Sequence, residues 1–379
     1  MKGGLLIFLV LIGETCAQTQ EPRPVPAASQ NEGKPAIPAV APLVEIIPHP
    51  GTLARPGMTL IWTAALQSAF DRVLGSKGPL PLEKVEPANP VIEAMGKFQW
   101  NEDSILPKDG WFAVAGPETP QLAAEATRKW RALAGPGEVP FEAISNADDA
   151  YAAFTGFKRD FAFKTDFFSS QEVRMEWGTE RTPVKYFGVG ASDAGLYSEN
   201  VRVLVHSPED NSQALQFLAR GGDDTLVLYM PAGTMRMDDA IRLLNTAQKA
   251  WRTRREDPLG AADKRLHFLD TVRVPDVSLS QEEDLTGKFS GRLHFKDIEK
   301  SGRIDLVKTS MKLDVDAKGV MVKAKAEIQG RGFGGAPAPP KNIPRRFSFD
   351  RPFFLFIWRD GAEWPYAAVW FGNAEGLVK

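Results

Sequence analysis

Three stretches of the chain carry apolar residues at every third or fourth position, which is the spacing of an amphipathic helix. These stretches are Trp62–Leu74, Thr119–Gly135 and Met237–Trp251. Thr119 is a residue that caps helices, and Pro120 after it suits a first helical turn. We predict one helix in each stretch.

Short β-rich runs separated by turn residues make up much of the rest of the chain. They read YAAFTGF, VRVLVHS, ALQFLA, TLVLYMP, LHFLDTVRVP, IDLVKTSMKLDV, RRFSF, PFFLFIW and YAAVWFG. Many strands with a few segregated helices indicate an α+β domain built on large antiparallel sheets.

The stretch DAKGVMVKAKAEIQGRGFGGAPAPPKN, residues 316–342, joins two unlike halves. The first half alternates like a strand, and its apolar positions are Val320, Val322, Ala324, Ala326 and Ile328. The second half is rich in glycine and proline, which suits an exposed loop. Two interpretations remain open from the pattern: a permanent hairpin with the preceding strand, or a strand-like segment held outside a sheet.

The composition is that of an ordinary globular protein, with 379 residues, 43% hydrophobic and 25% charged. A formal net charge of −2 gives no overall field that attracts nucleic acid or an anionic membrane. Cys16 is the only cysteine, so the rest of the chain has no disulfide, cysteine nucleophile or cysteine metal site. A core of this size is stable without such links.

The N-terminus resembles a secretory signal, residues 1–17. Lys2 is followed by the apolar run LLIFLVLIG and by Thr15-Cys16-Ala17, a small-residue cleavage site. The apolar run is too short to span a bilayer as a helix. We therefore expect a secreted or periplasmic protein, with lipid anchoring at Cys16 as the alternative. Residues 18–55 are a proline- and alanine-rich flexible linker, and we expect the folded domain over residues 56–379.

Catalytic patterns are missing from the sequence. It has no His-x-x-x-His pair and no Gly-x-Ser-x-Gly elbow, and GRGFGG does not precede a helix that could bind phosphate. A turn and a helix start explain Asp223-Asp224 and Asp238-Asp239. We therefore expect no enzymatic activity, no cofactor and no metal.

Five segments, in order, resemble segments of the serpins, the serine protease inhibitor superfamily, over about residues 150–376. The segments are YAAFTGFKRDFAFKTDF, ALQFLARGGDDTLVLYMPAG, MRMDDAIRLLNTAQKAW, VRVPDVSLSQEEDLTGKF, and FSFDRPFFLFIWRDG followed by AAVWFGNAEG. The resemblance implies a divergent serpin-like α+β fold, with a large antiparallel central sheet, a second β-sheet and helices on the periphery.

The resemblance also implies a function for the two-part stretch. Residues 319–344 would be an exposed reactive-centre-type loop that a serine protease cleaves, after which its N-terminal half enters the central sheet. The hinge residues would be Gly319, Val320, Val322 and Ala324. The candidate reactive-centre residues are Arg331, Phe333, Lys341 and Asn342. Arg331 and Lys341 suit a trypsin-like pocket and Phe333 a chymotrypsin-like one. The partner would be such a protease, with no nucleic acid and no membrane insertion of the mature chain, and we expect a monomer.

Several positions depart from the inhibitory pattern. Ala317, Val320 and MVKAK stand where inhibitory serpins carry a glutamate, a small hydroxyl residue and a run of alanines. The loop is longer than usual, and we expect the helix across the front of the central sheet to be shortened or absent. These departures favour the alternative, a non-inhibitory serpin-fold binding or carrier protein. An unrelated β-rich scaffold with a permanent hairpin is the third possibility.

Overall fold

The structure is a computed structural model that describes residues 5–14, 43–74, 82–136, 141, 150–169, 173–254, 264–296, 301–320 and 343–379. Its central sheet has the strand order β5-β19-β20-β1-β7-β6, and β18 pairs with β20 off this path. The strands are β5 (Leu82–Glu86), β19 (Arg292–Phe295), β20 (Ser301–Val315), β1 (Leu5–Glu14), β7 (Ala150–Arg159), β6 (Trp111–Pro117) and β18 (Val277–Asp284). The strand pairings within this sheet are antiparallel.

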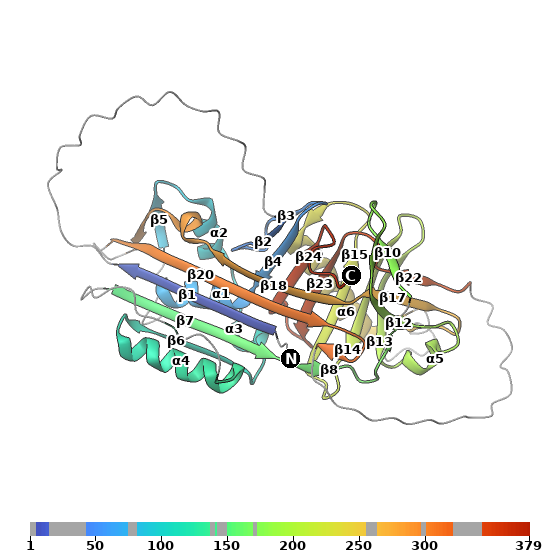
Figure 1. Ribbon diagram of the computed structural model, residues 1–379. Helices are drawn as coiled ribbons and strands as arrows, with labels where there is room; N and C mark the ends of the chain where they lie inside the picture. Colours follow the sequence, from blue (N-terminus) through green and yellow to red (C-terminus); the bar gives the residue numbers. More distant parts are fainter. Residues whose placement is uncertain are drawn as a thin grey trace.

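The second sheet has the order β13-β14-β15-β23-β24-β4-β2. Its strands are β13 (Val201–Ser207), β14 (Ser212–Leu218), β15 (Asp224–Met230), β23 (Phe353–Arg359), β24 (Ala367–Phe371), β4 (Thr59–Thr63) and β2 (Val44–Ile46). Figure 1 shows the central sheet on the left and this sheet on the right. Because β2 pairs with β4, sheet pairing begins before the expected domain start at Pro56.

A third sheet has the order β22-β17-β12-β9, formed by β22 (Arg346–Ser348), β17 (Thr271–Pro275), β12 (Tyr186–Val189) and β9 (Phe168–Ser169). The two-stranded pairs are β10 (Met175–Trp177) with β11 (Thr182–Val184), β16 (Met235–Arg236) with β3 (Leu53–Ala54), and β21 (Gly319–Val320) with β8 (Phe161–Ala162). The run LHFLDTVRVP was predicted to be one strand, but only Thr271–Pro275 is. Leu269 has a φ of 74°, which turns the chain just before β17.

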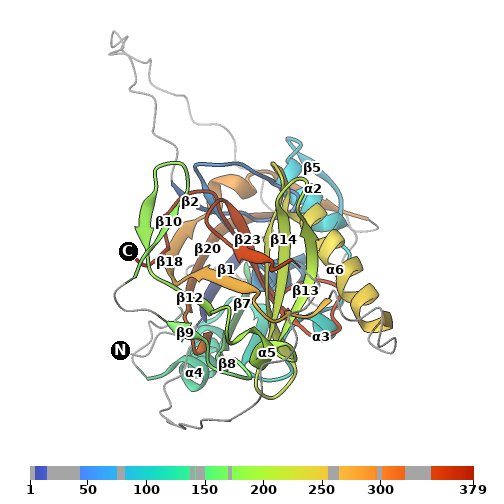
Figure 2. The same ribbon diagram turned by 90° about the vertical axis from the view of Figure 1, so that its right-hand side faces the viewer.

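The helices lie outside the sheets. They are α1 (Ala64–Leu74), α2 (Pro90–Lys97), α3 (Glu102–Ile105), α4 (Pro120–Ala134), α5 (Ala194–Tyr197), α6 (Met237–Arg254) and the 3₁₀ helix η2 (Thr286–Phe289). The helices predicted from apolar periodicity are confirmed as α1, α4 and α6. Figure 2 shows α6 along β13 and β14 of the second sheet. The expected α+β arrangement is therefore confirmed.

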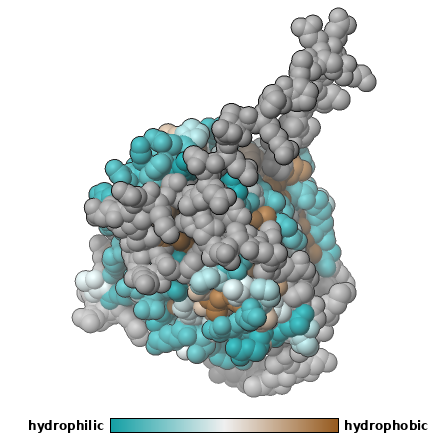
Figure 3. Space-filling model, turned by 90° about the vertical axis from the view of Figure 1, so that its left-hand side faces the viewer, coloured by the Kyte–Doolittle hydropathy of each residue, from teal (hydrophilic) through white to brown (hydrophobic). Residues whose placement is uncertain are grey.

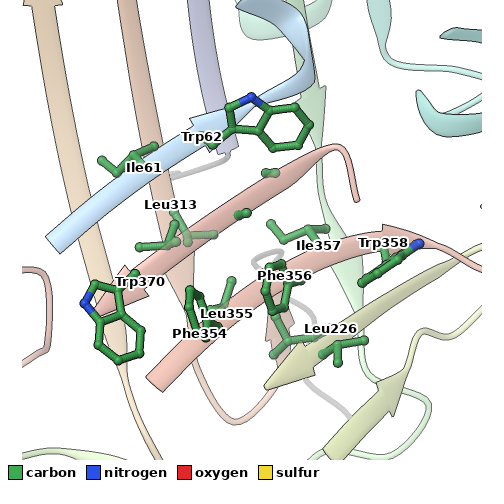
Figure 4. Close-up of a cluster of buried hydrophobic side chains, with 14 of the residues drawn as sticks. Ile61, Trp62, Leu226, Leu313, Phe354, Leu355, Phe356, Ile357, Trp358 and Trp370 are labelled. Carbon is green, nitrogen blue, oxygen red and sulfur yellow. The ribbon is translucent and has the colours of Figure 1, made fainter. Parts of the chain in front are cut away.

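Two apolar clusters form the core. The larger one fills the space under the central sheet and between the sheets, and Figure 4 shows the part around β23, with Phe354, Phe356 and Trp358. The smaller one lies under α4, where Trp130 packs with Phe112 and Phe154 of β6 and β7. The predicted helix α4, which has 15 residues, therefore covers the front of β6 and β7. We had expected the helix across the front of the central sheet to be shortened or absent. Described residues at the end of the molecule away from β8 are mainly hydrophilic (Figure 3).

Candidate strand-insertion site

The central sheet contains a position between β7 and β20 that we call the insertion site. β1 occupies it, and pairs with β7 along all ten of its residues and with β20 from Leu6 to Glu14. Leu5 stands opposite Arg159 and Glu14 opposite Ala150 on β7. Because β1 is antiparallel to each neighbour, β7 and β20 run parallel to one another on its two sides.

The back face of the insertion site is apolar and is covered by α1. Its buried side chains are Phe157, Thr155 and Ala153 of β7 and Met311, Thr309 and Val307 of β20. The Thr155 hydroxyl donates a hydrogen bond of 2.8 Å to the Ala65 carbonyl of α1. A strand that enters this site must therefore present small or apolar side chains to this face.

The front face differs along its length. Near Phe154 and Ala152 it belongs to the apolar cluster under α4, against which Leu306 of β20 also packs. Toward the other end, Lys158 of β7 and Lys312 of β20 are partly exposed. A strand in the site therefore meets apolar groups at one end of the front face and positive charge at the other.

The predicted hinge begins where β20 ends. The chain reverses over Asp316–Gly319, with hydrogen bonds from Asp316 N to Gly319 O (3.1 Å) and from Gly319 N to Asp316 O (3.2 Å). Gly319 has a φ of 144°, and a Cβ there would lie 2.4 Å from the carbonyl oxygen of Phe161. Glycine is therefore required by both backbone conformation and close approach. Val320 follows with 1% of its surface exposed.

The first residues after the reversal pair with β8, not with β20. Gly319 stands opposite Ala162 and Val320 opposite Phe161. Among the described residues, β1 pairs along one edge of β20, and β18 and β19 pair along the other. The permanent hairpin that the alternation allowed therefore does not extend along β20 in this structure.

Aromatic rings pack beside the hinge, with Phe163 between Phe167, Phe187 and Phe217. Phe163 N donates to Lys318 O (2.9 Å), and Phe167 N donates to Ala317 O (2.7 Å). These two bonds join the turn to the segment that carries the aromatic cluster. Ala317 is therefore a buried structural residue of this turn.

Asp276 lies near the hinge and has a shifted pKa. Asp276 precedes β18, whose Val277 pairs with Val315 at the end of β20. Burial, and after it the negative charge of Asp316, raise the pKa of Asp276 to about 6. Its Oδ1 atom is buried and has no hydrogen-bond partner among the described residues. The charged form of Asp276 is therefore disfavoured in the fold.

The chain that follows residues 321–342 is bonded to the folded body through Arg345 and β22. Arg345 makes hydrogen bonds to the carboxylate of Asp270 from its backbone N (2.8 Å), Nε (3.1 Å) and one guanidinium nitrogen (2.7 Å). Asp270 is fully buried. β22 then pairs in parallel with β17. Both ends of the intervening segment are therefore anchored to the folded body.

The structure describes two of the predicted site residues, and their predicted role stays a prediction. Gly319 and Val320 lie together at the hinge, as described above. Val322, Ala324, Arg331, Phe333, Lys341 and Asn342 lie outside the described residues. Sequence reasoning missed β1 as a member of the site, because its apolar run had the composition of a secretory signal.

Solved structures similar to this chain include serpins. Serpin48 of the insect Tenebrio molitor is 12% identical with a TM-score of 0.38, and the match covers 67% of this chain and 65% of that one. The thermophilic serpin tengpin is 10% identical with a TM-score of 0.37, covering 68% and 64%. Human glycosylated kallistatin is 14% identical with a TM-score of 0.36, covering 67% and 63%. The match thus spans less than two thirds of each of these proteins. No protein-family model and no curated protein matches the sequence.

Among the residues that the structure describes, none of the helices is both long and apolar enough to cross a membrane.

Proposed function

We propose that the protein is a serpin-like suicide substrate of a serine protease. The protease cuts the segment between the hinge and β22, and the N-terminal half of the cut segment enters the insertion site between β7 and β20. The serine of the protease forms the acyl bond. This chain therefore supplies the cleaved segment and the sheet that accepts it, but no catalytic group.

The register at the hinge carries this proposal. Continued without a bulge along β7, the pairing of Val320 with Phe161 puts residue 322 opposite Arg159 and residue 331 opposite Ala150. These are the partners that Leu5 and Glu14 of β1 have in the structure. The hinge thus directs the following residues into a site that accepts a ten-residue strand.

The alternation of the segment fits the two faces of the site. In this register Ala324 comes between Phe157 and Met311, and Ala326 comes between Thr155 and Thr309, which are all buried on the α1 side. The polar residues between them, such as Lys325, then belong to the front face. A shift by one residue would bury the lysines instead, so the pattern specifies the register.

The length of the site favours one cleavage point. A strand from Val322 to Arg331 fills the whole length of β7, so a cut after Arg331 releases a segment that matches the site. A cut after Phe333 leaves a short remainder, and a cut after Lys341 leaves a longer one outside the sheet. We therefore place the reactive bond after Arg331, for a trypsin-like protease.

The energy for trapping comes from completing the sheet. A strand between β7 and β20 makes the row antiparallel throughout and fills both backbone edges. Placing its alanines and Ile328 on the α1 face adds apolar burial. We place the protein outside the cytoplasm, in the secreted or periplasmic space, on the strength of the signal-like N-terminus.

A digestion followed by a melt tests the proposal. Residues 18–379, the chain expected after removal of the signal, are titrated with trypsin, and the products are resolved on a denaturing gel, located by mass and melted. We expect a cut after Arg331, a denaturant-resistant band with the protease, and a sharply raised melting temperature of the cut chain. A raised melting temperature without that band supports the non-inhibitory alternative. A cut chain of unchanged stability rules out insertion.

A further inference from the structure

The N-terminal segment that resembles a secretory signal forms the middle strand of the central sheet. Leu6–Glu14 pair with β20, with one register shift between Ile12 and Gly13, and Leu5–Glu14 pair with β7 without a shift. Both backbone edges of the segment are therefore used. Both neighbours of the segment, β7 and β20, are far from it along the sequence.

The composition of the segment suits this position. LLIFLVLIGE is apolar at eight consecutive positions, which is typical of a strand buried on both faces as well as of the apolar part of a secretory signal. Its register partners on the α1 side are buried, and Phe154 and Leu306 belong to the apolar cluster on the front. The composition of these ten residues therefore suits both a secretory signal and a central strand of the sheet.

We propose that residues 5–14 act as an internal placeholder strand, which keeps the insertion site closed for as long as the segment remains attached to the chain. Removal of the segment, at the small-residue site after Ala17, opens the position between β7 and β20. A processing peptidase would thus convert a closed form into a receptive one.

The placeholder and the segment after the hinge compete for the same positions. The Leu6 position lies between Lys158 of β7 and Lys312 of β20. In the register proposed above, Lys323 would take this position and place three positive charges in adjacent strands, which is unfavourable. Leucine avoids this repulsion.

The regulatory consequence rests on the proposed function, but the placement of the strand does not. A chain that keeps residues 5–14 in the site can be cut after the hinge without gaining stability, because no vacancy is open. The closed and receptive forms therefore differ before any protease is added, and this difference can be measured separately.

The test uses the full chain, 1–379, and a full-chain variant, Leu9→Pro. Proline removes a backbone N–H and disfavours a central strand. Ala28→Pro is the matched control, since it adds a proline to a stretch already rich in them. Each protein is melted with and without a synthetic peptide of residues 320–331, and hydrogen exchange is followed over residues 150–159 and 301–315.

We expect Leu9→Pro to lower the melting temperature by about 10 °C, the shift that a loss of several kcal/mol gives in a protein of this size. Exchange should accelerate in β7 and β20, and the peptide should restore the melting temperature of Leu9→Pro while leaving the full chain and Ala28→Pro unchanged. Equal melting and equal exchange in all three proteins would overturn the proposal. A concentration-dependent dimer of the full chain that Leu9→Pro abolishes would also overturn it, because the strand would then come from a second copy.

A cysteine pair covers the case in which Leu9→Pro does not fold. In the full chain carrying Cys16→Ser, Leu9→Cys and Thr309→Cys stand opposite each other, so we expect a disulfide under mild oxidation. Phe8→Cys with Thr309→Cys, one position out of register, is the control that should remain reduced. Failure of the Leu9–Thr309 pair to oxidise in a folded chain would place residues 5–14 elsewhere. If the disulfide forms but the cut 18–379 chain gains no stability, the placeholder stands and the proposed function fails.

Discussion

The two large sheets differ in how their middle strands are supplied. In the second sheet, β15, β23, β24 and β4 lie in a continuous row, and every residue of β15, β24 and β4 is buried. In the central sheet, the strand between β7 and β20 comes from residues 5–14, near the N-terminus. Under the two proposals above, the second sheet is a fixed frame, and the central sheet has one strand position that different segments of the chain can fill.

Polar contacts strengthen the connection between the two sheets. Arg159, the last residue of β7, lies 2.5 Å from the carboxylate of Asp224 in β15, which is 2% exposed. The Tyr366 hydroxyl donates to the same carboxylate at 3.1 Å. Burial, and the charge of Asp224 after it, raise the pKa of Tyr366 well above its ordinary value. β7 is thus held by the frame, so entry of a strand beside it need not move this end.

The largest effect is expected in the frame. Phe356→Ala removes a fully buried ring of β23 that contacts Phe354 and Trp358. We expect the free energy of unfolding to fall by about 3–5 kcal/mol. Urea unfolding should show this loss equally in the uncut and the protease-cut chain, because the frame is the same in both. A loss confined to the cut chain would show that the second sheet changes on cleavage.

A pair of glutamate substitutions probes the insertion site itself. Ala324→Glu would put a carboxylate between Phe157 and Met311, and should remove several kcal/mol of the stability gained on cleavage. Lys325→Glu introduces the same residue toward the front face and should change that gain by less than about 1 kcal/mol. The measurement is the melting temperature of each cut chain relative to its uncut form. Equal effects would mean that the segment never enters the sheet in this register.

The hinge should respond to a single methyl group. Gly319→Ala places a Cβ close to the Phe161 carbonyl at a φ that alanine rarely adopts. We expect a loss of about 1–3 kcal/mol in the uncut chain, from backbone strain. Lys318→Ala, an exposed neighbour in the same turn, is the control. A Gly319→Ala chain as stable as the control would show that β21 does not pair with β8.

The smallest effect concerns pH. Because the pKa of Asp276 is raised to about 6 from an ordinary value of 3.8, the folded chain holds this proton more tightly than the unfolded one. Its contribution to stability is thus full below about pH 4 and is lost as the pH rises through about 6. Asp276→Asn should flatten the fall in stability over this range, as followed by chemical unfolding at stepped pH. Some slope should remain, since burial also raises the pKa of Asp71 to about 6. A stability difference between the wild type and Asp276→Asn that stays the same at every pH would contradict the assignment.

Helices could be predicted from the sequence because local signals act on them directly. The Thr119 hydroxyl accepts a hydrogen bond from Leu122 N (3.1 Å), which is the cap that Thr119-Pro120 indicated. The β-rich run IDLVKTSMKLDV likewise predicted β20. Turn chemistry was harder to foresee, since Asp270 accepts a bond from His267 N and so ends the run that we expected to be one strand.

The occupant of the central sheet could not be predicted from the sequence. An apolar run of eight or nine residues has the same pattern in a secretory signal and in a buried strand, and only the partners on both sides distinguish them. Those partners, Lys158 and Lys312 among them, lie about 150 and 300 positions along the chain. The ion pair between Arg159 and Asp224 could not be predicted either, because two charged residues so far apart in the sequence leave no local signal.

The central claim, that the segment after the hinge enters between β7 and β20 once it is cut, can be tested by a cross-strand disulfide. In residues 18–379, which contain no natural cysteine, Thr309→Cys is combined with Ala326→Cys, and free thiols are counted under mild oxidation before and after proteolysis. The account predicts two free thiols in the uncut chain and none in the cut chain, whereas the control pair Thr309→Cys with Lys325→Cys stays reduced. Two free thiols in the cut chain, with the fold intact, would contradict it.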